Sequence, residues 1–199
     1  MLGLLAVAVA YLLGSVPFGY LLVKWSNGAD VRASGSGNIG ATNVFRTAGR
    51  GAGLATLLLD LGKGFAAVWV AAQLTGGAAE WTSLAALAVM AGHSYPVFLK
   101  FQGGKAVASL VGAFAFLTPL PLAAVTLVFV AAVAVTRRVS AGSIVGAATF
   151  PFGVWLILHP PFQITAAAFV AGAFVIYRHK SNWKRLRSGT EDVFSWSAK

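Results

Sequence analysis

The sequence contains no cysteine, and only five of its 199 residues are acidic. The absence of cysteine excludes thiol catalysis, disulfide bonds and metal sites with thiolate ligands. The acidic residues provide neither a His-Glu-x-x-His motif nor a carboxylate cluster of the kind that binds metals; they are Asp30, Asp60, Glu80, Glu191 and Asp192. We therefore expect no metal ion and no cofactor.

Charge of either sign is scarce. Only 10% of the residues are charged and 58% are hydrophobic, whereas a soluble domain carries about 25% charged residues. This composition predicts an all-α polytopic membrane protein. A chain of 199 residues leaves no room for a separate soluble domain, so we expect one integral-membrane domain over residues 1–199.

Long apolar runs define the expected spans. They cover residues 2–23, 54–74, 83–99, 106–118, 120–136, 142–158 and 162–177, which predicts seven transmembrane helices. Several runs are shorter than the roughly 20 residues that a perpendicular span needs. Run 106–118 is the weakest, and a re-entrant hairpin with 120–136 is the alternative. The first cation, Lys24, follows the first run, so we expect a retained span and not a cleaved signal peptide.

The cations lie in alternate connections between these runs. Every Lys and Arg except Lys63 falls in segments 24–53, 100–105, 137–141 and 178–199, and none falls in 75–82, 119 or 159–161. The positive-inside rule then places the N-terminus outside and the C-terminus in the cytoplasm. This distribution explains the net charge of +10 without a nucleic-acid partner, and we expect membrane lipid contacts instead.

Two common catalytic patterns are missing. No His is followed five positions later by Asp, and no Gly-x-Ser-x-Gly nucleophile elbow occurs at a strand–helix turn. The chain is therefore rich in groups that bind anions and poor in candidate bases.

The first polar segment runs from Arg32 to Arg46. Glycines allow positive φ and free backbone N–H groups to point at an anion, and Arg46 is suited to a two-point contact with phosphate. A flexible linker would not need the two Asn and two Arg residues of this segment. The expected ligands to a substrate phosphate here are Gly35, Ser36, Gly37, Asn38, Gly40, Thr42, Asn43 and Arg46.

A second polar segment, Leu59–Gly64, lies inside a predicted span. Asp60 and Lys63 are three residues apart and share a helix face. Charges inside a bilayer are costly and are usually paired or functional. Two interpretations stay open, a mutual ion pair and a phosphate ligand.

The third segment runs from His93 to Lys105. Gly103-Gly104-Lys105 before a helix predicts free N–H groups, a helix dipole and an ammonium at one anion site. His93 is either a base or a structural polar residue between helices, and we favour the structural role.

The fourth segment, Arg178–Leu186, follows the last span. A membrane anchor accounts for its cations and for Trp183, but not for His179 and Asn182. Because residues three apart share a helix face, we expect His179 and Asn182 to meet the Ser36–Asn43 loop together. Arg185 is a further candidate phosphate ligand.

Taken together, these motifs resemble the bacterial integral-membrane, acyl-phosphate-dependent glycerol-3-phosphate acyltransferase family. The matching elements are Gly14–Tyr20, Gly-Ser-Gly-Asn-x-Gly-Ala-Thr-Asn at 35–43, Leu-Asp-x-x-Lys-Gly at 59–64, His-x-aromatic-Pro with Gly-Gly-Lys at 93–105, and Arg-His-x-x-Asn-x-x-Arg-Leu at 178–186. Three positions depart from the family pattern. Gln102 replaces a basic residue, Ala106 a glycine and Trp183 an aliphatic residue.

The resemblance implies an enzyme of the bacterial inner membrane with a cytoplasmic active site. It would transfer a fatty acyl group from acyl phosphate to the 1-hydroxyl of sn-glycerol 3-phosphate, the first step of phospholipid synthesis, giving lysophosphatidic acid and phosphate. A monomer would suffice.

On the residues and the resemblance together, we predict the following roles. The catalytic residues are Ser36, Arg46, Lys105, His179 and Asn182; the phosphate ligands are Gly35, Gly37, Asn38, Gly40, Thr42, Asn43, Lys63, Gly103, Gly104 and Arg185; the supporting residues are Asp60 and His93. The donor's phosphate is the expected base and His179 the fallback. Which phosphate each site binds stays open.

The alternative is a transporter or channel for a phosphorylated solute. The short turns on the non-cytoplasmic side contain no Lys or Arg, and a transporter needs polar access from both sides. The acyltransferase is therefore favoured.

Overall fold

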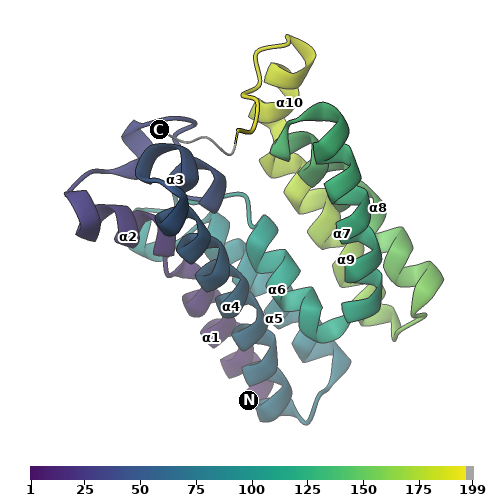
Figure 1. The fold of residues 1–199 in the computed structure, drawn as a ribbon. Coiled ribbons are helices and arrows are strands. Elements are labelled where there is room, and N and C mark those ends of the chain that lie inside the picture. The colour runs from purple at the N-terminus through teal and green to yellow at the C-terminus, as the bar shows by residue number, and fades with distance from the viewer. Residues whose placement is uncertain (196–199) are drawn as a thin grey trace.

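The computed structural model describes residues 1–195, and within that range the chain is helical with no strand (Figure 1). The main helices are α1 (Leu2–Ser15), α4 (Arg50–Thr75), α5 (Ala79–Ser94), α6 (Val107–Leu117), α7 (Pro119–Thr136), α8 (Val139–Ile157) and α9 (Phe162–Arg178). Three shorter helices and two 3₁₀ turns join them: α2 (Phe18–Asn27), η1 (Val31–Ala33), α3 (Ala41–Ala48), η2 (Val97–Leu99) and α10 (Lys180–Arg187). The predicted all-α fold is confirmed.

Five helical segments of the described chain are long and apolar enough to cross a membrane. They are Leu2–Asn27, Arg50–Thr75, Ala79–Leu99, Pro119–Thr136 and Val139–Ile157. The helices α6 and α9 are apolar but have only 11 and 17 residues. They coincide with the predicted runs 106–118 and 162–177. The multi-pass character is therefore established by five segments, and α6 and α9 fall short of the length of a perpendicular span.

The first apolar segment breaks at Pro17, which the hydropathy pattern did not reveal. Helix α1 ends at Ser15 and α2 begins at Phe18. Proline has no N–H to donate and its ring interferes with the preceding turn, so a helix that reaches it ends or bends. The break leaves the Val16 carbonyl exposed to a neighbouring helix, and the Lys63 ammonium on α4 donates to it at 2.8 Å.

Close packing between helices relies on small residues. Helices α4 and α6 touch where Gly64 faces the Ser109 carbonyl and Gly112 faces the Leu61 carbonyl, and a Cβ at either glycine would collide with that oxygen. Such contacts are a common means of helix association in membranes, where the hydrophobic effect between helices is weak. Gly64 and Gly112 are therefore packing residues.

Two apolar clusters form the interior. The larger one lies among α1, α4, α5, α6, α8 and α9 and includes an edge-to-face pair of Phe114 and Phe150 at 4.8 Å. The smaller cluster fastens the segment between α2 and α3 to η2; its buried members are Val23, Val31, Ile39, Val44 and Leu99. Polar loops of the first and third motifs therefore rest on a common apolar base.

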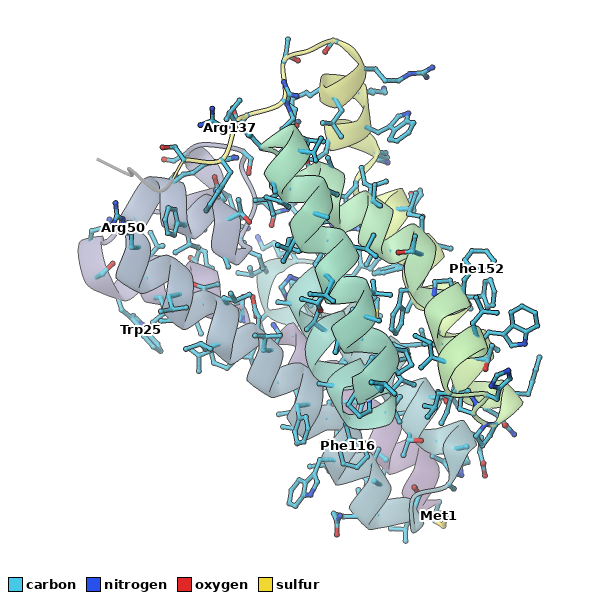
Figure 2. All side chains as sticks on the ribbon, turned by 45° about the vertical axis from the view of Figure 1, so that its right-hand side comes forward. Met1, Trp25, Arg50, Phe116, Arg137 and Phe152 are labelled. Atoms are coloured by element: carbon cyan, nitrogen blue, oxygen red, sulfur yellow. The ribbon has the colours of Figure 1, made fainter. Side chains whose placement is uncertain are left out.

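Long-range folding collects the polar motifs at one end of the bundle. Arg50 and Arg137 lie at this end, whereas Met1 and Phe116 lie at the other (Figure 2). Phe152 points away from the bundle on the side and is 52% exposed, as expected of a helix surface that faces lipid. We call the end that carries η1, α3, residues 100–106 and α10 the polar end.

Candidate active site at the polar end

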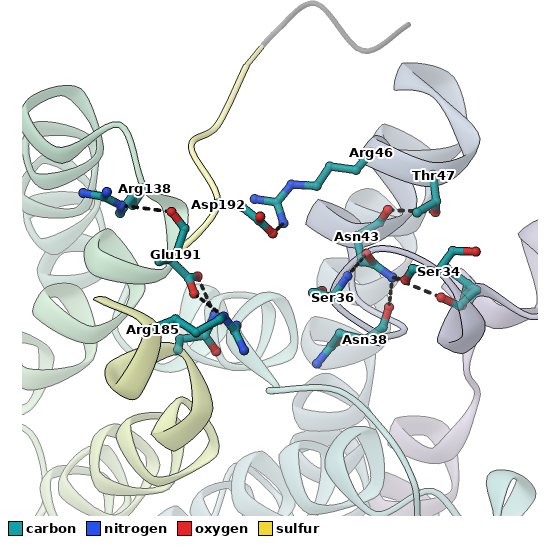
Figure 3. A network of polar contacts seen from close by, with 12 residues as sticks. Ser34, Ser36, Asn38, Asn43, Arg46, Thr47, Arg138, Arg185, Glu191 and Asp192 are labelled. Atoms are coloured by element: carbon teal, nitrogen blue, oxygen red, sulfur yellow. Dashed lines mark hydrogen bonds and ion pairs between the residues drawn. The ribbon is translucent and has the colours of Figure 1, made fainter. Parts of the chain in front are cut away.

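The side chain of Asn43 holds the first polar loop through hydrogen bonds to its backbone. Its side chain is 2% exposed, and its Nδ2 lies 2.8 Å from the Asn38 carbonyl and 3.1 Å from the Val31 and Ser34 carbonyls. Its Oδ1 accepts a hydrogen bond from the Ser36 N–H at 2.8 Å (Figure 3). The amide was predicted to bind a substrate phosphate, but in this structure its groups hold the loop.

The loop needs glycine at two of its turns. Gly35 and Gly37 have φ of 58° and 69°, a left-handed conformation that favours glycine. A Cβ at Gly35 would also collide with Oδ1 of Asn43. The predicted positive φ is confirmed at these two positions, whereas Gly40 has φ of −76°.

The prediction of free glycine N–H groups is wrong at four positions, Gly37, Gly40, Gly103 and Gly104. The Gly37 N–H donates to the Ser34 carbonyl and the Gly40 N–H to Oδ1 of Asn38. In the third motif, the N–H groups of Gly103 and Gly104 donate to the carbonyls of Ser94 and His93. Backbone donors in a compact turn satisfy each other before any ligand arrives, because a buried unpaired N–H is costly. These two glycines are required for space, since a Cβ at either would collide with His93.

Side chains, and not these N–H groups, are what the first loop offers to a ligand. Within residues 1–195, Oγ of Ser36, Nδ2 of Asn38 and Oγ1 of Thr42 have no hydrogen-bond partner. Ser36 is exposed, and Asn38 and Thr42 are half-buried. Three neutral side-chain donors are therefore available on this loop and at the start of α3.

Arg46 projects from α3 toward the C-terminal segment. Its Nη1 pairs with Oδ2 of Asp192 at 2.8 Å, and the ring centroids of Phe45 and Phe194 lie 5.6 Å apart (Figure 3). The chain after α10 therefore crosses from one side of the polar end to the other. The sequence analysis gave Asp192 no role, and its position beside the candidate phosphate ligand depends on this crossing.

Several charged side chains of the polar end act on Lys105. Burial lowers its pKa to about 8; nearby Glu191 opposes this effect, and the positive charges of Arg185, Arg46 and Arg178 add to it. These charges come from α3, α9, α10 and the C-terminal segment. Groups from motifs distant in sequence therefore act on one ammonium, which confirms that the first, third and fourth motifs converge.

His179 lies at the junction of α9 and α10 and is 3% exposed. Its Nδ1 lies 2.8 Å from the Val175 carbonyl, which can only accept, so Nδ1 carries the proton and Nε2 is the basic nitrogen. Burial, and next the positive charge of Lys105, lower its pKa to about 4. The imidazole is therefore neutral at physiological pH.

A buried carboxylate holds the rest of the fourth motif. Oε1 of Glu191 accepts from Nδ2 of Asn182 at 2.6 Å, and Oε2 accepts from Nε of Arg185 at 2.7 Å (Figure 3). Burial would raise the pKa of Glu191, but hydrogen bonds such as those from Asn182 and Arg185 outweigh this and lower it. An ionised carboxylate only accepts hydrogen bonds, so Oδ1 of Asn182 must face elsewhere, and it is buried without a partner in the described chain.

The side chain of Asn182 forms no hydrogen bond to the Ser36–Asn43 loop in the described chain. The hydrogen bond of its side chain is to Glu191, a residue to which the sequence analysis gave no role. The one available signal for Glu191 was an acidic residue in a strongly basic segment.

The buried charges of the second motif pair with each other. Nζ of Lys63 lies 2.8 Å from Oδ1 of Asp60, and Nδ1 of His93 lies 3.5 Å from the same oxygen. All three side chains are at most 4% exposed. The ion-pair interpretation is confirmed. The structure does not support the prediction of Lys63 as a phosphate ligand, because its ammonium is already paired with Asp60 and the Val16 carbonyl.

A cavity of about 460 Å³ opens between the first and third motifs. It is lined by Arg32, Gly37, Ile39, Phe101, Gln102, Gly103 and Arg178. Arg32 is paired with Asp30, with Nη2 and Oδ2 2.6 Å apart, and lies over the ring of Tyr20. No group of three or more His, Asp or Glu side chains able to hold a metal ion occurs among the described residues.

Comparison with known proteins identifies close relatives. The sequence model of the glycerol-3-phosphate acyltransferase family matches residues 4–189. The chain is 46% identical over 191 residues to a glycerol-3-phosphate acyltransferase of Geobacter sulfurreducens, covering 96% of this chain and 97% of the relative. It is 47% identical over 186 residues to one of Desulforamulus reducens, covering 92% and 90%.

Solved structures agree. The fold is similar to a crystal structure of PlsY, an integral membrane glycerol 3-phosphate acyltransferase, in its glycerol 3-phosphate form. The TM-score is 0.91 at 36% identity, and 97% of this chain and 96% of that chain are covered. A second crystal structure of PlsY, in its lysophosphatidic acid form, has a TM-score of 0.87 at 34% identity and covers 98% and 96%.

Proposed function

The chain belongs to the glycerol-3-phosphate acyltransferase family, and from this premise we propose that it transfers a fatty acyl group from acyl phosphate to the 1-hydroxyl of sn-glycerol 3-phosphate. It is an integral membrane acyltransferase, and the transporter interpretation is set aside because its relatives are acyltransferases over nearly their whole length. The products would be lysophosphatidic acid and inorganic phosphate. The relatives with glycerol 3-phosphate and lysophosphatidic acid support this acceptor and this product.

The observation that carries the proposal is the group of cations around Lys105. Arg46, Arg178 and Arg185 lie close enough to lower its pKa, although they come from three different helices. Like charges held together need an anion to balance them, and within residues 1–195 the carboxylates paired with these cations are those of Glu191 and Asp192. Two substrates that each carry a phosphate would supply that charge.

Acyl phosphate is an activated donor, so the protein has mainly to position the reactants. Orientation alone contributes up to about 7–11 kcal/mol to such a reaction, and a donor aimed at the developing oxyanion about 3–4 kcal/mol. We assign Arg46 and Lys105 to the substrate phosphates, and Ser36 and Asn182 to substrate oxygens. The hydroxyl of glycerol 3-phosphate attacks the acyl carbon, the bond to the phosphate oxygen breaks, and phosphate leaves.

The proton of the attacking hydroxyl needs an acceptor. We assign it to the phosphate of the donor, which becomes the leaving group. His179 is the alternative, because its Nε2 is the unprotonated ring nitrogen. Its low pKa makes it a weak base, which favours the substrate phosphate.

Topology completes the proposal. We propose seven spans, with α6 and α9 counted with the five longer segments, the N-terminus outside, and the polar end in the cytoplasm. The cations of segments 24–53, 100–105, 137–141 and 178–199 support this orientation. A bacterial inner membrane, one domain and a functional monomer are part of the same proposal.

Single cysteines at Ser36 and Ser188 should resist an impermeant reagent added to intact cells, whereas one at Glu80 should react. Labelling of Ser36 or Ser188 from outside would contradict it.

The donor is tested with purified protein. Phosphate should be released from acyl phosphate only when glycerol 3-phosphate is present, and acyl-CoA should give little product, because the chain lacks the His-x-x-x-x-Asp pair that would activate the acceptor. Equal rates with both donors would overturn the proposed mechanism.

A further inference from the structure

The turn that carries Lys105 is held by a side chain from another helix. Arg178, the last residue of α9, donates from Nη2 to the Gly104 carbonyl at 2.9 Å and from Nε to the same oxygen at 3.2 Å. Its Nη2 also lies 3.3 Å from the Gly103 carbonyl and 3.5 Å from that of Ser94. One guanidinium therefore gathers three carbonyls of the third motif.

The other side of this guanidinium is supported as well. Its Cζ lies 4.8 Å from the ring centroid of Tyr95, a cation–π contact. The Tyr95 ring packs edge-on against Phe174 of α9. The backbone carbonyl of Tyr95 accepts a hydrogen bond from the Tyr11 hydroxyl of α1 at 2.8 Å. The position of Arg178 is thus determined by three helices.

The turn cannot easily hold its own shape. Lys100, Phe101 and Ala106 have φ of 51°, 63° and 61°, left-handed values that are unusual for residues other than glycine. Each such residue carries a steric cost, because its Cβ approaches the following carbonyl oxygen. Ala106 directly follows Lys105, so the strain lies next to the ammonium that the turn presents.

We infer that Arg178 is a positioning residue that clamps the Gly103–Gly104 turn and thereby sets Lys105 beside His179 and Asn182. This inference rests on the proposed role of Lys105 as a phosphate ligand. Because His179 follows Arg178 in the chain, the clamp fixes the distance between the third and fourth motifs. The Gly103 and Gly104 carbonyls are drawn toward the guanidinium, which also neutralises oxygens that would repel a phosphate.

Arginine is suited to this role and lysine is not. Nε and Nη2 reach the same carbonyl oxygen from a rigid plane, and the guanidinium lies over the Tyr95 ring. A lysine keeps the charge but offers neither the fork nor the flat face. Arg178→Lys therefore removes the clamp while it preserves the electrostatic field at Lys105.

The competing interpretation is direct contact between Arg178 and substrate. Arg178 lines the 460 Å³ cavity, and no hydrogen bond from its Nη1 to the described chain is formed. A double-variant cycle separates the two roles. If Arg178 acts only through Lys105, its substitution has little further effect once Lys105 is lost; if it binds substrate or only maintains the fold, the two effects multiply.

The experiment compares wild type, Arg178→Lys, Lys105→Ala and the double variant, purified in detergent, with both substrates varied in turn. Radiolabelled glycerol 3-phosphate allows slow turnover to be measured. Arg187→Lys is the matched control, because Arg187 is exposed at the end of α10 and its side chain forms no hydrogen bond or ion pair with the described chain. Tyr95→Leu, which removes the support of the guanidinium, is a second test if Arg178→Lys is unstable.

We expect Arg178→Lys to lower kcat/KM about tenfold, as for loss of one charge-assisted hydrogen bond, and to change kcat and the two KM values in the pattern of Lys105→Ala. In the Lys105→Ala background it should cost no more than about twofold. The kcat/KM of Arg187→Lys should equal that of the wild type. Multiplying effects, or a pattern unlike that of Lys105→Ala, would overturn the clamp. Turnover by the wild type alone tests the proposed function. A failure of the proposed function is therefore distinguishable from a failure of the clamp.

Discussion

The pH dependence of turnover tests the electrostatics of the site. Lys105, with a pKa of about 8, must be protonated to bind phosphate as a cation. It is then about 90% protonated at pH 7 and about 10% at pH 9. We expect kcat/KM to fall above pH 8 and to approach a tenfold loss per unit. The chain has no cysteine, so no thiol supplies this limb.

The acid side of the profile separates the candidate bases. His179, with a pKa of about 4, is only about 3% protonated at pH 5.5. It therefore does not titrate between pH 5 and 8. A substrate phosphate, whose second pKa is about 6, does titrate in this range. We expect an acid limb near pH 6 that belongs to the substrate.

The assay is the rate of product formation from pH 5 to 9.5 in wild type, His179→Ala and Lys105→Arg. The acid limb should survive in His179→Ala at a lower overall rate, because the group that titrates is still present. In Lys105→Arg any residual activity should lose the alkaline limb, since a guanidinium stays protonated throughout. Loss of the acid limb in His179→Ala would assign the base to His179, and an unchanged alkaline limb in Lys105→Arg would refute the role of Lys105.

Three further predictions concern the loops. Ala106→Gly should raise the free energy of unfolding in detergent by about 1 kcal/mol, because φ of 61° costs alanine more than glycine; a lower melting temperature would contradict this. Asn43→Ala should lower the free energy of unfolding by about 1–3 kcal/mol, since it leaves buried loop groups unpaired; unchanged melting and activity would show that the loop holds itself. Asp192→Asn should lower the KM for one phosphorylated substrate about two- to fivefold by releasing Arg46 from an exposed ion pair, and a raised KM would instead make Asp192 part of the binding site.

Much of the architecture was predictable because it depends on local composition. The all-α multi-pass class follows from long apolar runs, and these runs recur as helices within a few residues of the predicted bounds. The break at Pro17 and the helix α3 inside the predicted loop 24–53 were missed. Hydropathy averages over a window, so it does not detect a single proline or a short amphipathic helix.

The candidate site was predictable in its residues but not in their partners. The sequence alone predicted phosphate ligands at Arg46 and Lys105 and a fallback base at His179, all on one side of the membrane, because the cations of their segments alternate with neutral turns. It also left an ion pair of Asp60 and Lys63 as one of two interpretations, since residues three apart on a helix must be neighbours.

What only the tertiary structure decided is which donor meets which acceptor. Glu191 with Asn182, Asp192 with Arg46, and Arg178 with the Gly103–Gly104 carbonyls are contacts between side chains and segments brought together by folding. Composition and motif determine which groups a chain carries and on which side of a membrane they lie. A hydrogen bond needs atoms within about 3 Å and in line, and for segments far apart in sequence only the packing of the intervening helices sets that distance.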